Sequence, residues 1–323
     1  MTEELPHCRA GALPEVNEEE RWLIDGLWAH QGVGIVGGAP KCCKSWLGLD
    51  MAVSVASGTA CLGRYHVSGQ GGVLCYLAED DTAVVKSRLR SISGARALNL
   101  NNLPIEIITA PALRLDQPKD QQRLAHTVRV LAPRLLLLDP FVRLHRIDEN
   151  DAGQVSGVLA YLRALQREHH LAVVVVHHAR KNGNVAAAGQ ALRGSSDFHA
   201  WGDSNLYLRR NRDALQLTVE HRAAPAPVPI TLRLTSGVAT YLEVTDASDS
   251  NNDGASTDRL APQVLAALRD ATGPLSRATM RATLRIRNER LGETLTRLAD
   301  SGAITRVGDA WTMATTAVPV PHP

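Results

Sequence analysis

The sequence lacks the features that would place the protein in a membrane or in an oxidising compartment. No apolar run approaches the length of a membrane-spanning helix, and the acidic N-terminal region does not match a signal peptide. The five cysteines form no C-x-x-C pair, and their odd number favours reduced thiols over disulfides or structural zinc. These absences predict a cytoplasmic protein that does not associate with a membrane.

Aromatic residues and net charge are also scarce. Phe, Trp and Tyr make up 4% of the 323 residues, and the formal net charge is +2. Few rings are available for base stacking, so a DNA-binding mode would rely on phosphate contacts, although the charge alone does not indicate nucleic acid. With 44% hydrophobic and 21% charged residues, the chain is long enough for one large core and a small second domain.

The strongest motif is a glycine-rich turn between an apolar strand and an amphipathic helix. Residues 34–45 read GIVGGAPKCCKS, and apolar residues follow at helical spacing. Loop N–H groups and the positive end of the helix then point at one anion site. We expect Lys44 between the β- and γ-phosphates of ATP and Ser45 on Mg²⁺. The predicted nucleotide-binding residues are Gly37, Gly38, Ala39, Pro40, Lys41, Cys42, Cys43, Lys44, Ser45 and Trp46.

Cys43 departs from the phosphate-binding motif G-x-x-x-x-G-K-[ST], which has glycine at this position. We expect the cysteine to fit with its backbone in the helical region of φ/ψ space and its thiol turned away from the nucleotide. The pair Cys42-Cys43 also leaves thiol regulation open as an alternative to simple packing, because helix N-termini lower the pKa of thiols.

Two predicted buried strands end in carboxylates. The run at 73–78 precedes Glu79, and the leucines at 135–138 precede Asp139. Ligands bind outside the carboxyl ends of parallel strands, so a strand at 73–78 next to the phosphate-loop strand would aim Glu79 at the γ-phosphate and an attacking water. Asp139 is expected to hold Mg²⁺ through water, the alternative being a helix cap.

The acids that follow Glu79 have a simpler interpretation. Asp80 or Asp81 suits the N-cap of the next helix better than Glu79 does. A further N-cap is expected at Asp151, before an apolar periodic segment.

A strand over 171–176 ends in His177-His178. Adjacent strand residues point to opposite faces, so the two rings do not share a metal ion easily. We expect His178 to sense the γ-phosphate and His177 to be structural. The small residues at 179–194 then form either a loop that contacts DNA in response to nucleotide or a solvated surface loop.

Antiparallel strands are expected at 206–208, 215–220, 230–234 and 240–244. The turn between the first two carries Arg209 and Arg210. Arginines at such a tip either keep it soluble or, in a ring of subunits, enter the neighbour's site and neutralise transition-state charge.

A polar stretch separates a second, smaller unit from this core. Helical patterns and a hairpin turning at Gly308-Asp309 predict a winged helix-turn-helix, which binds either a DNA groove or another protein. Its third helix is accompanied by basic residues, namely Arg285, Arg287, Arg290 and Arg297. The expected divisions are an N-terminal segment at 1–30, an ATPase domain at 31–245, a linker at 246–258, the winged helix at 259–313 and a disordered tail at 314–323.

The motifs, taken in order, resemble one family. They are Gly38-Ala39-Pro40-Lys41 with Lys44-Ser45, Tyr76-Leu77-Ala78-Glu79-Asp80-Asp81, Leu138-Asp139-Pro140, Val176-His177-His178, Arg193-Gly194-Ser195-Ser196, Asp203 and Leu206-Tyr207-Leu208-Arg209-Arg210. Over roughly 20–245 the chain is similar to RecA-fold ATPases related to the plasmid replicative helicase RepA, which are relatives of DnaB. The winged helix is not part of that compact pattern.

The resemblance implies a ring, often a hexamer, with ATP between subunits. By position, Lys44 and Ser45 would bind phosphate and Mg²⁺, and Glu79 would be the catalytic base. Asp139 would be the second metal residue and His178 the sensor of the γ-phosphate. Arg209 or Arg210 would be the arginine finger that enters the site of the neighbouring subunit.

We therefore expect an α/β fold, with a RecA-like P-loop NTPase core built on a mainly parallel sheet and followed by a small winged helix. The predicted function is a homo-hexameric DNA motor that uses ATP and Mg²⁺ and moves single-stranded DNA through loops at 145–150 and 179–194. The alternative is an ATP-gated regulator or assembly platform that binds duplex DNA through the winged helix. A small-molecule kinase lacks support because the sequence shows no lid or acceptor pocket.

Overall fold

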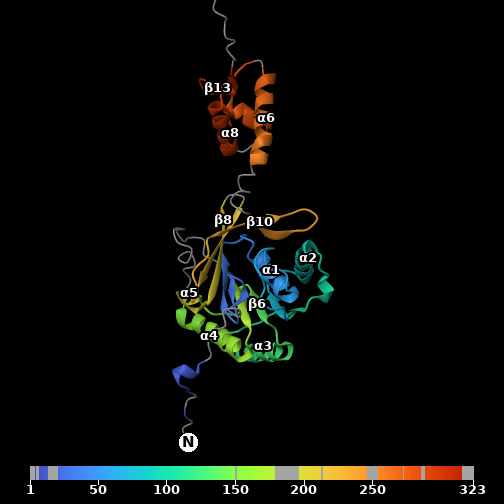
Figure 1. Cartoon of the computed structure of the whole chain (residues 1–323), viewed down its shortest axis with the longest axis vertical. Coiled ribbons are helices and arrows are strands. Elements are labelled where there is room, and N and C mark those ends of the chain that lie inside the picture. The colour runs from blue at the N-terminus through green and yellow to red at the C-terminus, as the bar shows by residue number, and fades with distance from the viewer. Residues whose placement is uncertain are drawn as a thin grey trace, which may run out of the picture. The chain divides into compact units, whose positions relative to one another are not determined.

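The computed structural model contains two compact units, Met1–Thr245 and Asp246–Pro323 (Figure 1). The structure describes residues 4, 7–13, 21–149, 151–178, 196–211, 214–245, 254–271, 273–284 and 288–314. Among these residues, no helix combines the length and the apolar character needed to cross a bilayer.

A nine-stranded sheet forms the centre of the first unit, in the order β11-β10-β9-β8-β3-β7-β6-β4-β5. The strands from β8 to β5 in this order are parallel, and β9, β10 and β11 extend the sheet in antiparallel fashion. Their bounds are β3 Val33–Gly38, β4 Val73–Leu77, β5 Ile105–Ile107, β6 Leu135–Asp139, β7 Ala172–His178, β8 Ser204–Asn211, β9 Ala214–His221, β10 Ile230–Thr235 and β11 Tyr241–Val244. The sheet is mainly parallel, as predicted.

One prediction about this sheet was wrong. We expected the strand before Glu79 to neighbour the phosphate-loop strand, but β7 and β6 lie between β3 and β4. Parallel strands are joined by crossover connections, so their order in the sheet does not follow from their order in the chain. β4 and β6 do pair, and Leu77 lies opposite Asp139 in the register.

Helices cover both faces of the sheet (Figure 1). The bounds of these helices are α1 Lys44–Ser57, α2 Thr82–Ala95, α3 Pro118–Leu131, α4 Ala152–His169 and α5 Ser196–Trp201. Side chains of β6 alternate between two cores: Leu135 and Leu137 pack with residues of α1 and α2, whereas Leu136 and Leu138 pack with residues of α3 and α4. Asp81 and Asp151 cap α2 and α4, as predicted.

Short elements complete the first unit. They are the 3-10 helices η1 Ala10–Ala12, η3 Leu100–Asn102 and η4 Phe141–Arg143, and the antiparallel strands β1 Trp22–Ile24 and β2 Trp28–Ala29. Leu23, Ile24, Leu27 and Trp28 are buried in the core that also contains α1.

The second unit has three helices and a three-stranded antiparallel sheet in the order β12-β14-β13. The bounds are α6 Gly254–Asp270, α7 Arg277–Leu284, α8 Asn288–Asp300, β12 Leu275–Ser276, β13 Ile304–Val307 and β14 Ala310–Met313. Ser276 accepts a hydrogen bond from the N–H of Thr279 at 3.1 Å, so it caps α7 as expected. α6 begins at Gly254, inside the stretch expected to be linker, because the polar residues there form its first turn.

Several sequence predictions lie outside the described residues. They concern the loop at 179–194, Arg285, Arg287, the side chain of Arg290 and the tail after residue 314. The assignment of the second unit as a winged helix, and the domain limits, stay predictions.

Candidate nucleotide-binding site

The predicted site residues meet at the carboxyl edge of the parallel strands. The phosphate loop follows β3, Glu79 follows β4, Asp139 ends β6 and His178 ends β7. Parallel strands end at one edge, so crossovers bring residues far apart in sequence to one place.

The phosphate loop has a backbone that glycine would adopt with less strain. Lys41 and Cys43 have φ values of 65° and 63°. The prediction for Cys43 was therefore wrong: it lies in the left-handed region, with ψ of 25°, at the point where the loop turns into α1. Gly38 is required for another reason, because a Cβ there would lie 2.3 Å from the carbonyl oxygen of Leu208 on β8.

Lys44 is held inside the loop. The residue is 4% exposed, and its Nζ donates hydrogen bonds to the carbonyls of Gly38 at 2.9 Å and Ala39 at 2.8 Å. Burial lowers the pKa of Lys44, while nearby anionic groups, including Asp139 and Glu79, oppose the shift. A buried ammonium held only by carbonyls is well suited to bind phosphate oxygens.

The start of α1 offers donors to an anion. The first N–H groups of a helix have no partner within it, and Cys43 makes no capping hydrogen bond with its side chain. These groups and the helix dipole favour a phosphate at this position. The loop therefore fits the triphosphate of a nucleotide.

Ser45 and Asp139 form the oxygen donor set next to the loop. The Ser45 hydroxyl lies near the Asp139 carboxylate, and Asp139 is 6% exposed. Burial raises the pKa of Asp139 to about 6, although the nearby Ser45 hydroxyl opposes the shift. Among the described residues, no three His, Cys, Asp or Glu side chains form a metal cluster. A hydroxyl and one carboxylate suit Mg²⁺, which takes its other ligands from water and phosphates.

Glu79 contacts residues from two other strand ends. Its Oε1 accepts a hydrogen bond from Nε of Arg143 at 3.0 Å, and its Oε2 lies 3.6 Å from Nε2 of His178. Since Asp81 provides the cap of α2, the Glu79 carboxylate is not the helix cap.

The two histidines of β7 point to opposite faces, as expected. His177 is 4% exposed and stacks on Phe198 of α5 with ring centroids 4.4 Å apart. Burial lowers its pKa to about 4. The pKa of His178 is also lowered, first by burial and then by the charge of Lys44, with Glu79 opposing.

The sequence reasoning missed two arginines at this site. Arg143 holds Glu79, as described above. Arg88 of α2 pairs with Asp80 at 3.0 Å and lies over the ring of Trp46, 5.6 Å from its centroid. Arg88 lies eight residues after Asp80, beyond the i,i+4 spacing of helical ion pairs, so no local spacing in the sequence indicated this contact.

Arg210 lies on the phosphate loop of its own chain. Its Nη2 donates to the carbonyl of Lys41 at 3.1 Å and lies 3.8 Å from the Cys43 sulfur. Burial raises the pKa of the Cys43 thiol despite the charge of Arg210, which favours simple packing over the alternative of thiol regulation at Cys43. Alternation along β8 aims Arg209 at the opposite face.

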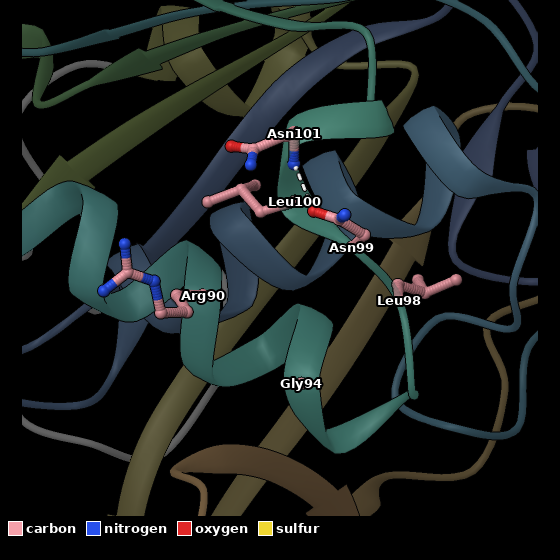
Figure 2. Close-up of a pocket in the computed structure, with 6 residues that line it drawn as sticks. All are labelled: Arg90, Gly94, Leu98, Asn99, Leu100 and Asn101. Atoms are coloured by element: carbon pink, nitrogen blue, oxygen red, sulfur yellow. Dashed lines mark hydrogen bonds between the residues drawn. The ribbon is translucent and has the colours of Figure 1, made fainter.

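A separate pocket of about 180 Å³ lies on α2 and η3 (Figure 2). Its lining residues are Arg90, Gly94, Leu98, Asn99, Leu100 and Asn101. None of them belongs to the site at the strand ends, so this pocket has no part in the nucleotide geometry.

The mainly parallel sheet, the loop after β3, the acid that follows β4 and the acid that ends β6 define a P-loop ATPase with a RecA-like fold. Residues 2–184, more than half of the 323 residues, match the profile of a family described as AAA domain. The chain belongs to this family.

Two solved structures were also similar. A DnaB-like replicative helicase, described together with its interactions with primase, aligns with a TM-score of 0.48 and 14% identity over 64% of this chain. A RadB recombinase aligns with a TM-score of 0.47 and 18% identity over 67% of this chain and 91% of its own. The match spans 56% of the length of the helicase chain.

Proposed function

We propose that this chain hydrolyses ATP and uses the energy to move single-stranded DNA, working as a homo-hexameric ring of the replicative-helicase type. The observation that carries the ATPase part is the convergence of Lys44, Ser45, Asp139 and Glu79 at one edge of the sheet. A binding module without hydrolysis would not need an acid aimed into the site beside the metal residues.

Each residue has a distinct task in this proposal. Lys44 and the N–H groups of α1 hold the phosphates, while Ser45 and Asp139 hold Mg²⁺. When bound there, Mg²⁺ would supply positive charge beside the phosphate oxygens. Glu79 orients a water and accepts its proton, and His178 contacts the γ-phosphate. Arg209 is the candidate finger for a neighbouring subunit.

Support for DNA as the partner comes from exposed basic groups near the site. Arg143 and Arg146 are exposed on and just after η4, at the start of the predicted DNA loop at 145–150. Guanidinium groups bind nucleic-acid phosphates without reading sequence, which suits a motor that moves along a strand.

ATP turnover measured with and without single-stranded DNA tests the proposal. We expect the strand to raise the rate, and Glu79→Gln to abolish turnover while ATP still binds. Equal rates with and without DNA would contradict the motor. Gradient sedimentation with ATP and single-stranded DNA tests the hexamer, which predicts a ring-sized species.

The second candidate is an ATP-gated platform that binds duplex DNA through the second unit. The arrangement of three helices with a β-hairpin favours it, because this element set is that of a winged helix-turn-helix. Removal of residues 246–323 distinguishes the motor from the platform. A motor retains strand-stimulated turnover, whereas the platform loses nearly all affinity for DNA.

A further inference from the structure

The pairing of β8 with β3 determines where Arg210 lies. Leu208 is the register partner of Gly38, the last residue before the phosphate loop. Side chains two residues apart on a strand share a face, and Leu208 packs in the core that contains α1. Arg210 therefore extends from β8 over the loop, beyond the point where the two strands part.

The loop needs support at this place. Cys43 has a φ of 63°, a conformation that a residue with a Cβ rarely adopts and that glycine adopts freely. Lys41, two residues earlier, has a φ of 65°. These two residues flank Cys42, which is 3% exposed and belongs to the core.

Arg210 contacts the two strained residues. One nitrogen, Nη2, donates to the Lys41 carbonyl at 3.1 Å and lies 3.8 Å from the sulfur of Cys43. The same side chain therefore holds both ends of the short turn that precedes Lys44. Arg210 contacts the phosphate loop of its own chain, whereas a finger for a neighbour would extend away from its own loop.

We propose that Arg210 is a positioning residue that keeps the phosphate loop of its own chain in its nucleotide-binding shape, in compensation for the cysteine at position 43. The inference rests on ATP binding at this loop, which is the first part of the proposed function. Arg209, on the opposite face of β8, is left as the arginine available to a neighbouring subunit.

The geometry separates this role from that of a finger. A residue that holds the loop in its binding shape raises the affinity for nucleotide. Without it, part of the binding free energy is spent on ordering the loop. An arginine finger acts on transition-state charge, so its loss lowers kcat and leaves nucleotide affinity nearly unchanged. The need for Arg210 should also fall when glycine relieves the backbone at position 43.

The test measures binding of the ATP analogue AMP-PNP with Mg²⁺ to the full chain by calorimetry. Arg210→Ala should weaken binding about tenfold, the size of one hydrogen bond from a charged donor. In a Cys43→Gly background the same change should cost about threefold or less. Arg129→Ala, which removes an exposed charge from α3, is the matched control and should bind as the unmodified chain does.

The outcomes distinguish the inference from the function on which it rests. Failure of the unmodified chain to bind AMP-PNP overturns both. Binding by the unmodified chain together with equally tight binding by Arg210→Ala overturns the inference alone, and so does a loss of kcat at constant affinity. A loss of affinity that Cys43→Gly does not reduce also overturns it, because Arg210 would then act without regard to the strained backbone.

Discussion

Arg143 donates a hydrogen bond from Nε to Oε1 of Glu79 over 3.0 Å, across 64 positions of the chain. The guanidinium side chain is 57% exposed and the carboxylate side chain 41% exposed. An ion pair so open to water contributes about 0–1 kcal/mol and is easily broken. The backbone of Arg143 is held more firmly than its side chain, because Arg114 donates a hydrogen bond to the Arg143 carbonyl. The pair thus directs the Glu79 carboxylate through a weak contact from a fixed position.

Replacement of Arg143 by alanine should therefore raise ATP turnover in the absence of DNA. With the carboxylate free to reach a water, we expect an increase of about two- to fivefold, which corresponds to the small energy of an exposed pair. The measurement is steady-state turnover at saturating ATP. Arg146→Ala removes another exposed charge three residues away and serves as control. A lower rate for Arg143→Ala would mean that Arg143 assists the chemistry.

The dependence of nucleotide binding on Mg²⁺ should distinguish the role of Asp139 from that of Lys44. Asp139→Asn keeps the hydrogen-bonding shape but removes the charge that holds the ion, so turnover should fall at least about a hundredfold. Chelation with EDTA should weaken AMP-PNP binding to the unmodified chain and have much less effect on Asp139→Asn. Lys44→Ala, in contrast, should lose nucleotide affinity whether or not Mg²⁺ is present. If Asp139→Asn and the unmodified chain were equally sensitive to EDTA, Asp139 would not be a metal-binding residue.

Acid should destabilise the protein through His177. Its pKa is about 4 because burial disfavours the charged ring; Glu149 opposes this shift, whereas His178, Lys44 and His145 add to it. The folded-state pKa lies below the ordinary value of 6.5, so the stabilising contribution is complete above pH 6.5 and is lost as the pH falls toward 4. The shift corresponds to roughly 3 kcal/mol.

Urea unfolding of the unmodified chain and of His177→Phe between pH 7.5 and pH 4 measures this contribution. Phenylalanine can stack on Phe198 without titrating, so the difference in unfolding free energy should move in favour of the variant as the pH falls. His126→Phe, on exposed α3 surface, should change the pH profile little. Parallel profiles for His177→Phe and the unmodified chain would show that His177 does not titrate with folding.

Local patterns predicted the parts of the site that depend on strand ends. Acids after 73–78 and 135–138 could be placed at one edge because parallel strands end together, and the opposite directions of His177 and His178 follow from strand alternation. The same alternation distinguishes Arg210 from Arg209 once the partner strand of β3 is known. Pairing of β8 with β3 joins residues about 170 positions apart, and no local pattern specifies it.

Other features could not be predicted because they depend on tertiary contacts or on local backbone conformation. The left-handed backbone at Cys43 arises where the phosphate loop turns into α1, and a cysteine gives no sign of it. Arg143 reaches Glu79 only because β6 and β4 are neighbours. The early start of α6 was missed because polar residues typical of a linker also occupy the first turn of a helix.

A buried ion pair joins the two helices that lead away from the site. Asp50 of α1 is 1% exposed, and its Oδ2 lies 2.6 Å from Nη2 of Arg96, the C-cap residue of α2. Oδ1 of Asp50 accepts from the N–H of Leu62 at 2.8 Å, and Arg96 also donates to Ser54 at 2.8 Å. Since α1 begins with Lys44 and α2 follows Glu79, the pair fixes the helices that carry both halves of the site.

Asp50→Ala should lower the free energy of unfolding by about 3–5 kcal/mol, because it leaves the Arg96 guanidinium without its buried partner. The double change Asp50→Leu with Arg96→Met should be milder, since an apolar pair leaves no uncompensated charge. Chemical unfolding of the single and double variants gives the comparison, and Asp25→Ala, at a half-exposed carboxylate, is the control. If the single and double variants lose equal stability, lost packing between α1 and α2, and not an unpaired charge, is what destabilises the protein.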